Sequence, residues 1–193
     1  MDLQYLKQQA AGVAVGAVAL RRELHQWPKP GNQEFRTIEI IKRELENLGL
    51  KVEHPLPTGL LCTIFCEKEL DDDQNTSAEN GSKAGIALRA DIDGLPIQER
   101  LRLPFSSSVK GYMHACGHDV HTAVLLGTAG VLVKNKQMLK QNVKLLFQPA
   151  EETTGGAERM IAAGCFRNPE ISTIYGLHIK PELPAGQIGI QYG

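Results

Sequence analysis

The sequence lacks an apolar run long enough to cross a lipid bilayer. Its longest such run, AAGVAVGAVAL at residues 10–20, is far shorter than the roughly 20 residues that a membrane-spanning helix needs. The positive charges Arg21 and Arg22 follow this run, whereas a signal peptide carries its positive charges in front. We therefore expect a buried helix here and no membrane partner, with Gly12 and Gly16 allowing close packing against another element.

The sequence also lacks an excess of charge of either sign. The chain of 193 residues carries 21 basic and 22 acidic side chains, which gives a net charge of -1. Such a balance offers no basic surface to nucleic acid or to anionic lipid, so we expect neither as a partner.

Cysteine is scarce as well, with four residues in the whole chain. This number is too small for a disulfide-rich secreted scaffold, so we expect free or metal-bound thiols in a reducing compartment and a cytoplasmic location.

Hydrophobic residues make up 42% and charged residues 22% of the chain. This composition argues against intrinsic disorder and predicts one globular domain, or two at most.

Helical and strand-like patterns alternate along the chain. Helical spacing of apolar residues predicts four helices, at residues 2–27, 37–49, 119–136 and 155–164. Apolar, β-branched runs predict five strands, at residues 59–66, 84–92, 142–148, 172–179 and 186–192. The polar stretch at residues 71–83 is expected to be an exposed loop. The alternation predicts an α/β fold, with a mixed, largely parallel sheet flanked by helices.

The run HACGHDVH at residues 114–121 has the highest density of metal-binding side chains. Cys116 and His118, one residue apart, can direct a thiolate and an imidazole at one cation, a pair suited to zinc or manganese. Two other interpretations remain open. Cys116 could be the nucleophile of a cysteine hydrolase with His118 or His121 as its base, or the run could be a polar loop before a helix.

Three further sites follow expected strands. Asp91 and Asp93 end the strand RADID, a position where aspartates are common turn formers. Glu151 and Glu152 follow the strand LLFQ. Acids often precede helices, but in hydrolytic metal sites one carboxylate can bind the ion while its neighbour takes a proton from water. His178 closes the strand STIYGLHI. Because ligands of α/β sheets bind at the carboxyl ends of strands, we expect these groups to converge with the Cys-x-His pair at one edge.

Four consecutive stretches resemble signatures of the M20 family of metal-dependent aminoacylases and carboxypeptidases, in the branch of N-acyl-amino-acid amidohydrolases, hippurate hydrolases and auxin-conjugate hydrolases. They are RADIDGLPIQE, MHACGHDVHTAVLLGTA, LLFQPAEETTGGAERMIAAG and GLHIKPELPAGQIG. The earlier stretch RRELHQWPKPGNQEF also resembles the opening of that branch, with Lys29 where an acid is commoner. The resemblance extends from about residue 20 to the end of the chain.

The resemblance implies a zinc-exopeptidase-like catalytic domain that uses two divalent ions, Zn²⁺ or Mn²⁺, to hydrolyse the amide bond of small N-acyl amino acids. It implies that Glu151 is the general base and that four residues bind metal: Cys116, His118, Glu152 and His178. Four more residues would support the site: Asp91, Asp93, Asp119 and His114. His121 would pack beside it. Members of the family are often homodimers.

In the family, the segment that resembles LPAGQIGIQYG leads into an inserted dimerisation or lid domain, after which the chain completes the catalytic domain and supplies one more histidine ligand. We therefore expect residues 1–193 to form the N-terminal portion of the catalytic domain, an incomplete fold without the lid and the C-terminal segment. Alone, this portion is expected to be weakly active or inactive. A non-catalytic metal-binding or interaction fragment is the alternative from another functional class.

Overall fold

A computed structural model of the chain describes residues 2–67 and 84–190. The helices of this part are α1 (Leu3–His25), α2 (Phe35–Asn47), α3 (His118–Lys134), a short 3-10 helix (Lys136–Met138) and α4 (Gly156–Ala162). The strands are β1 (Val52–Leu56), β2 (Gly59–Ile64), β3 (Gly85–Asp91), β4 (Val143–Gln148) and β5 (Ile171–Gly176). They form one mixed sheet in the order β1-β2-β4-β3-β5, which confirms the predicted α/β fold.

The sheet combines a parallel part with an antiparallel part. β3 lies in the middle of the parallel part and pairs with β4 on one side and with β5 on the other. β2 is antiparallel to both β4 and β1. The carboxyl ends of β3, β4 and β5 therefore meet at one edge of the sheet, where the segments that follow them can share a site.

Two details of the expected secondary structure were wrong. β1 was not predicted, because its sequence VEHPL is short, charged and interrupted by Pro55, a composition tolerated at the edge of a sheet. The strand expected at residues 186–192 is irregular over residues 186–190. An apolar run forms a strand only where a neighbouring strand satisfies its backbone, and none of the described strands pairs with this segment. Residues 191–192 and the loop expected at 71–83 lie outside the described residues.

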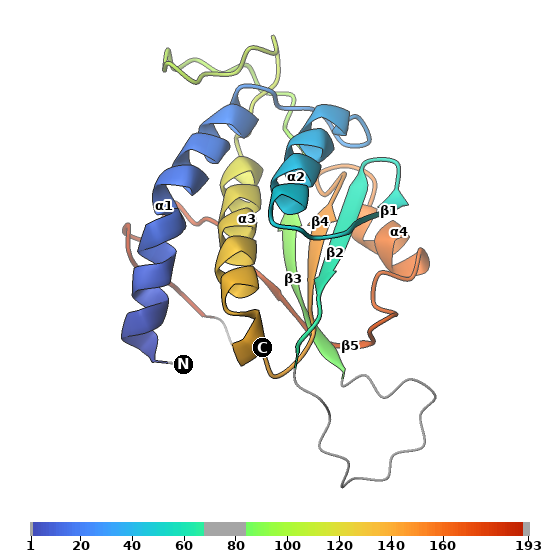
Figure 1. Ribbon diagram of the computed structural model, residues 1–193. Coiled ribbons are helices and arrows are strands. Elements are labelled where there is room, and N and C mark those ends of the chain that lie inside the picture. The colour runs from blue at the N-terminus through green and yellow to red at the C-terminus, as the bar shows by residue number, and fades with distance from the viewer. Residues whose placement is uncertain (1, 68–83, 191–193) are drawn as a thin grey trace, which may run out of the picture.

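Helices cover both faces of the sheet (Figure 1). Ile41 of α2 and Leu126 of α3 belong to the larger core cluster, together with Leu145 and Phe147 of β4. Met160 of α4 belongs to a second cluster on the opposite face. In Figure 1, α1 lies outside α3, as an additional layer on the same side of the sheet. None of the helices in the described ranges is long and apolar enough to span a lipid bilayer.

Successive residues of β4 alternate between the two faces. Leu145 and Phe147 contribute to the cluster with α2 and α3, whereas Leu146 between them contributes to the cluster with α4. Lys144 is an exception to the apolar pattern, since it is only 1% exposed. Its Nζ donates a hydrogen bond of 2.6 Å to the carbonyl of Arg167, which fastens the chain after α4 to the sheet. Because helices cover both faces of the sheet, its central strands carry apolar side chains on both sides.

Replacing Leu145 by alanine is expected to lower the free energy of unfolding by about 3 kcal/mol, because the side chain is fully buried in the larger core cluster. Leu103 provides a matched control, since it is 42% exposed. Leu103→Ala is expected to change the stability by less than about 0.5 kcal/mol. Urea unfolding followed by circular dichroism measures both values. Equal losses in the two variants would contradict the position assigned to Leu145.

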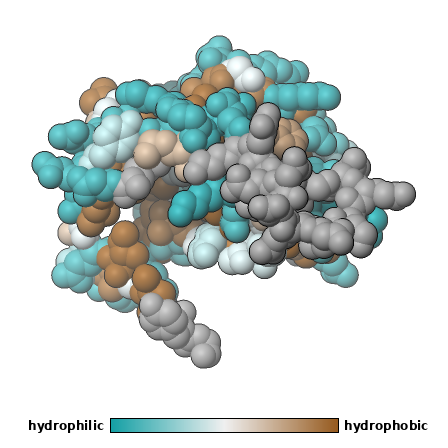
Figure 2. All heavy atoms as spheres, turned by 60° about the horizontal axis from the view of Figure 1, so that its bottom comes forward, coloured by the Kyte–Doolittle hydropathy of each residue, from teal (hydrophilic) through white to brown (hydrophobic). Residues whose placement is uncertain are grey.

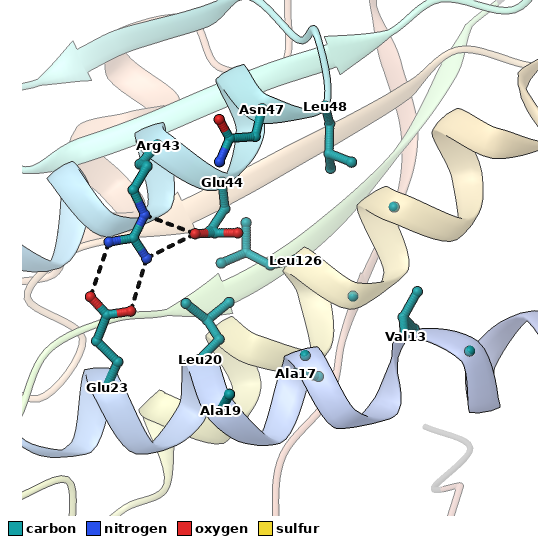
Figure 3. A pocket seen from close by; sticks show the side chains of 14 residues that line it. Val13, Ala17, Ala19, Leu20, Glu23, Arg43, Glu44, Asn47, Leu48 and Leu126 are labelled. Carbon is teal, nitrogen blue, oxygen red and sulfur yellow. Dashed lines mark hydrogen bonds and ion pairs between the residues drawn. The ribbon is translucent and has the colours of Figure 1, made fainter.

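The close packing expected at Gly12 and Gly16 was wrong. Both residues line a groove of about 440 Å³ between α1, α2 and α3 (Figure 3), and a Cβ atom added at either one would meet no atom within 4 Å. A Cβ atom added at Gly127 of α3 would instead lie 3.6 Å from a side chain of α1. Figure 3 also shows Arg43 of α2 paired with Glu23 of α1 across the groove. The glycine of α3 at which α1 packs closely is therefore Gly127.

Apolar side chains remain exposed along β5 and the segment that follows it. Ile174 and Tyr175 of β5 are 47% and 57% exposed, and Ile188 and Ile190 are 81% and 72% exposed. Figure 2 shows brown, hydrophobic atoms at the surface among teal, hydrophilic ones. Within the described ranges, β5 is an edge strand, and no element covers these side chains.

Candidate metal centre

The parallel strands deliver the predicted residues to one edge of the sheet. Asp91 is the last residue of β3, the two glutamates follow β4, and His178 follows β5. His118 is the first residue of α3. Three groups of side chains each offer ligand atoms within 4.8 Å of one another. They are Cys116, His118 and His178; Asp91, His118 and His121; and His118, Glu151 and Glu152. His118 belongs to all three groups, which therefore form one cluster.

His118 is the centre of this cluster. The side chain is 1% exposed, and its Nδ1 lies 2.9 Å from the carbonyl oxygen and 3.1 Å from Oδ1 of Asp93. Because both partners are acceptors, Nδ1 donates to them, which leaves Nε2 as the ligand atom of the neutral ring. Nε2 is buried and has no hydrogen-bond partner in the described part of the chain. It lies 3.7 Å from Oδ2 of Asp91 and 3.8 Å from Oε1 of Glu152.

A divalent cation fits the unpartnered Nε2 of His118. Nε2 is buried, has no partner and faces two carboxylate oxygens beyond hydrogen-bond distance, so a cation between these atoms would satisfy it. Asp93 also holds the ring by its other nitrogen. A carboxylate that orients a histidine in this way is common at metal sites, because it fixes the tautomer and the direction of the ring.

Cys116 reaches the cluster through a turn at Gly117. Gly117 has a φ of 89°, in the region that favours glycine, and a Cβ atom there would lie 3.1 Å from the side chain of Ile179. The turn sets Sγ of Cys116 at 3.4 Å from Nε2 of His178. Nδ1 of His178 lies 2.7 Å from the carbonyl of Ile179 and donates to it, so Nε2 keeps its lone pair. A sulfur and a second imidazole nitrogen therefore lie next to His118.

The Cys116 thiol is a poor nucleophile in this arrangement. Burial, together with the neighbouring Glu152 carboxylate, raises its pKa to about 12. A thiol nucleophile needs a lowered pKa or an adjacent base, whereas a bound cation would itself deprotonate the sulfur. His121 does not serve as that base, because both of its nitrogens are engaged. Nε2 of His178 lies 3.4 Å from the sulfur, but the pKa of the thiol stays raised beside it. The donor set therefore suits a metal better than it suits a cysteine hydrolase.

Asp91 and His121 form a supporting pair. Nδ1 of His121 donates a hydrogen bond of 2.6 Å to Asp91, and Nε2 of His121 accepts the backbone N–H of Ile179 at 3.0 Å. Arg89 lies 2.8 Å from the other oxygen of Asp91. Burial opposes ionisation, but the hydrogen bond from His121 and the nearby positive charges lower the pKa of Asp91 to about 2. The pair ties the end of β3 to the segment that carries His178.

Asp119 and His114 lie outside the cluster around His118. Oδ2 of Asp119 is 2.7 Å from Nδ1 of His25 and 2.8 Å from Nε of Arg21, so it fastens the start of α3 to α1. His114 is buried, and neither ring nitrogen has a hydrogen-bond partner among the residues with described positions. Its ring centroid is 6.4 Å from that of His25. The sequence reasoning missed His25, although it stands in the stretch RRELHQW that was singled out.

A second missed residue is Glu34, a buried acid at the start of α2. Burial raises its pKa, and the hydrogen bonds that it accepts oppose this shift only in part. The folded chain therefore binds the proton more tightly than the unfolded chain. The resulting stabilisation is fully present below the ordinary pKa of the carboxyl group and is lost as the pH rises through the raised pKa.

Glu34→Gln is expected to remove this loss of stability with rising pH. The free energy of unfolding of the variant, relative to that of the unchanged protein, should therefore increase as the pH rises above the ordinary pKa of the carboxyl group. Urea unfolding at several pH values measures the difference. A difference that stays constant as the pH rises would contradict the raised pKa.

Comparison with known proteins shows which proteins the chain is similar to. The family model described as peptidase family M20/M25/M40 matches residues 87–193. N-acetyl-L-cysteine deacetylase of Bacillus subtilis (strain 168) is 40% identical over 197 residues, which cover 100% of this chain and 44% of that protein. IAA-amino acid hydrolase ILR1-like 4 of Arabidopsis thaliana is 37% identical over 177 residues, which cover 91% of this chain and 37% of that protein.

A solved structure shares both the fold and the sequence. The crystal structure of the Bacillus subtilis YXEP protein, described as a dinuclear metal binding peptidase from the M20 family, matches with a TM-score of 0.84 and 39% identity. The match covers 95% of this chain and 48% of that one. The chain thus spans less than half the length of these relatives. From the family model, the related hydrolases and the shared fold, we conclude that the chain belongs to peptidase family M20/M25/M40.

Proposed function

We propose that the full-length protein hydrolyses the amide bond of N-acyl amino acids and uses two divalent ions, Zn²⁺ or Mn²⁺. The observation that carries the proposal is the buried, unpartnered Nε2 of His118, which shares one cluster with a cysteine, a second histidine and two glutamates. The names of two relatives, N-acetyl-L-cysteine deacetylase and IAA-amino acid hydrolase, support the substrate class. The solved relative described as dinuclear supports the number of ions.

Four residues of this chain would hold the ions: Cys116, His118, Glu152 and His178. Sulfur, imidazole and carboxylate ligands together suit zinc and related divalent metals. Asp93 supports this role, because it fixes the ring of His118 and also accepts the backbone N–H of Glu152 at 3.1 Å. One buried carboxylate thus orients two of the proposed ligands.

Glu151 would move the proton. Divalent ions held by these residues would polarise the substrate carbonyl and lower the pKa of the attacking water. The Glu151 carboxylate would accept a proton from that water as its oxygen bonds to the carbonyl carbon. When the carbon–nitrogen bond breaks, Glu151 would return the proton to the departing nitrogen, which otherwise would leave as an unstable amide anion. The products are a carboxylic acid and an amino acid.

We also propose that residues 1–193 form the N-terminal portion of the catalytic domain, in agreement with the share of the relatives that they match. These residues alone would then be weakly active or inactive, because an incomplete ligand set binds metal less tightly. A cytoplasmic location and a homodimeric full-length protein complete the proposal.

The proposal is tested by assaying the full-length protein on N-acetyl, N-benzoyl and indole-3-acetyl amino acids and measuring the released amino acid. We expect turnover that a chelator abolishes and that added Zn²⁺ or Mn²⁺ restores. Turnover that resists the chelator but is lost on thiol alkylation would instead support a cysteine hydrolase. Stoichiometric metal binding without turnover of any of these substrates would favour a non-catalytic metal-binding module.

A further inference from the structure

The two glutamates of the cluster extend from a tight turn. Ala150, directly before Glu151, is fully buried and has a φ of 51°, which residues other than glycine rarely adopt. The carbonyl of Ala150 accepts the N–H groups of Thr154 at 3.3 Å and Gly156 at 3.4 Å, which closes the turn on itself. A left-handed alanine persists only where the surrounding structure holds it in place.

The turn is tightly enclosed by its surroundings. A Cβ atom added at Gly156 would collide with the carbonyl oxygen of Pro149. A Cβ atom added at Gly31, in the segment before α2, would lie 2.9 Å from Cα of Ala150. Asn32 of the same segment donates a hydrogen bond of 3.0 Å to the hydroxyl of Thr154. The segment before α2 therefore packs directly against the turn, although the two are more than 100 residues apart in the sequence.

Glu34 connects these two segments by a hydrogen bond. Its Oε1 accepts the backbone N–H of Ala150 at 2.8 Å, and the side chain is 0% exposed. On the other side of Glu151, the backbone N–H of Glu152 donates to Oδ2 of Asp93 at 3.1 Å. A buried carboxylate thus holds the peptide N–H of each residue that flanks Glu151.

The side chain of Glu151 has no such support of its own. It is exposed, and it takes part in no hydrogen bond or ion pair with any residue in the described ranges. Its direction therefore depends on the backbone of the turn. Glu34 is itself fixed, because it begins α2 and its carbonyl accepts the N–H of the buried Ile38 at 2.9 Å.

We propose that Glu34 is a positioning residue for Glu151, acting through its hydrogen bond to the backbone N–H of Ala150. This inference rests on the proposed function, in which Glu151 is the proton acceptor. A general base must lie within hydrogen-bond reach of the water that it deprotonates, and misplacement by about 1 Å can lower a rate about a hundredfold. Glu34 adjusts the turn and does not touch the substrate.

The hydrogen bond is tested first, without any activity measurement. Hydrogen–deuterium exchange of peptides covering residues 148–156 is compared in the unchanged full-length protein, Glu34→Ala, Glu34→Gln and Lys144→Met. Lys144 is a matched control, because it too is a buried charged residue that holds a loop backbone, by hydrogen bonds to the carbonyls of Arg167 and Asn168 at the opposite end of β4. We expect exchange in the turn to be at least about tenfold faster in Glu34→Ala and unchanged in Lys144→Met.

The kinetic effect is tested second, on the same variants. Glu34→Ala is expected to lower kcat about a hundredfold, with KM and metal content within about threefold of the unchanged protein. Glu34→Gln is expected to recover most of kcat, since its amide oxygen can accept the N–H of Ala150. Lys144→Met is expected to lose stability but to keep kcat, which separates positioning from a general loss of folding.

Three results would overturn the positioning role. They are unchanged exchange at residues 148–156 in both Glu34 variants, an unchanged kcat in a folded Glu34→Ala protein, and an equal loss of kcat in Lys144→Met. If Glu34→Ala does not fold, the Glu34→Gln protein decides. A folded Glu34→Gln protein with a kcat about a hundredfold below that of the unchanged protein would overturn the positioning role as well. Failure of the proposed function is recognised separately, by full activity of Glu151→Gln or by the absence of turnover in the unchanged protein. The exchange measurement still decides whether Glu34 holds the turn.

Discussion

Replacement of Glu151 by glutamine in the full-length protein is expected to lower kcat for N-acyl amino acid hydrolysis by about a thousandfold, while the metal content stays the same. The amide of glutamine has nearly the shape of the carboxylate but accepts no proton at neutral pH. General acid–base catalysis by one side chain contributes roughly 10² to 10⁴ to a rate, and here the same group serves both the attack and the departure.

Steady-state kinetics and metal analysis of the purified variant measure the two quantities. Glu158→Gln is a suitable control, since Glu158 is an exposed acid in the first turn of α4, and it should leave kcat unchanged. Glu152→Gln should differ from Glu151→Gln in its metal content. Because Glu152 is a proposed ligand, its loss should lower the metal content together with kcat. A Glu151→Gln protein with undiminished turnover would refute the assignment of the general base.

Loss of His118 is expected to abolish metal binding at the cluster. In His118→Asn the buried nitrogen shared by all three groups of ligand atoms is removed, so the affinity for zinc should fall by more than about a hundredfold. His54→Asn is the control, because His54 is exposed on β1 and should keep full affinity. Cys116→Ser and Cys66→Ser form a corresponding pair, in which the first variant weakens binding and the second does not.

Isothermal titration of the metal-free protein with zinc measures these affinities directly. The unchanged protein should bind about two ions per chain in the full-length form. If His118→Asn and Cys116→Ser bind zinc as tightly as their controls do, the metal is held elsewhere and the proposed ligand set is wrong.

Much of the fold could be predicted from apolar patterns, because strands covered on both faces need continuous apolar runs. Leu145, Leu146 and Phe147 are buried on alternate sides of β4, and this is why the run NVKLLFQ was recognised as a strand. β1 could not be recognised in this way, since an edge strand with Pro55 depends on its neighbour β2 and not on its own composition. The prediction of a strand at residues 186–192 was wrong for the opposite reason, because residues 186–190 are apolar but have no described strand beside them.

The convergence of the site residues could also be predicted, because the carboxyl ends of parallel strands share one edge. The side-chain partnerships could not. The contact between Glu34 and Ala150 joins residues 116 apart, and that between His121 and Asp91 joins residues 30 apart. Such hydrogen-bonded pairs depend on how whole helices and strands pack together. The spacing of residues within one stretch of sequence therefore does not predict them. His121 illustrates the consequence, since it was a candidate base by proximity, yet both of its nitrogens are engaged.

Anomalous X-ray diffraction from crystals of the full-length protein grown with zinc would test the central claim most directly, because it locates the ion without reference to activity. The account predicts an anomalous peak about 2.3 Å from Sγ of Cys116 or about 2.0 to 2.1 Å from Nε2 of His118, with Glu152 or His178 also bound. A well-occupied zinc site elsewhere, with Nε2 of His118 bonded to a protein group or to water, would contradict it.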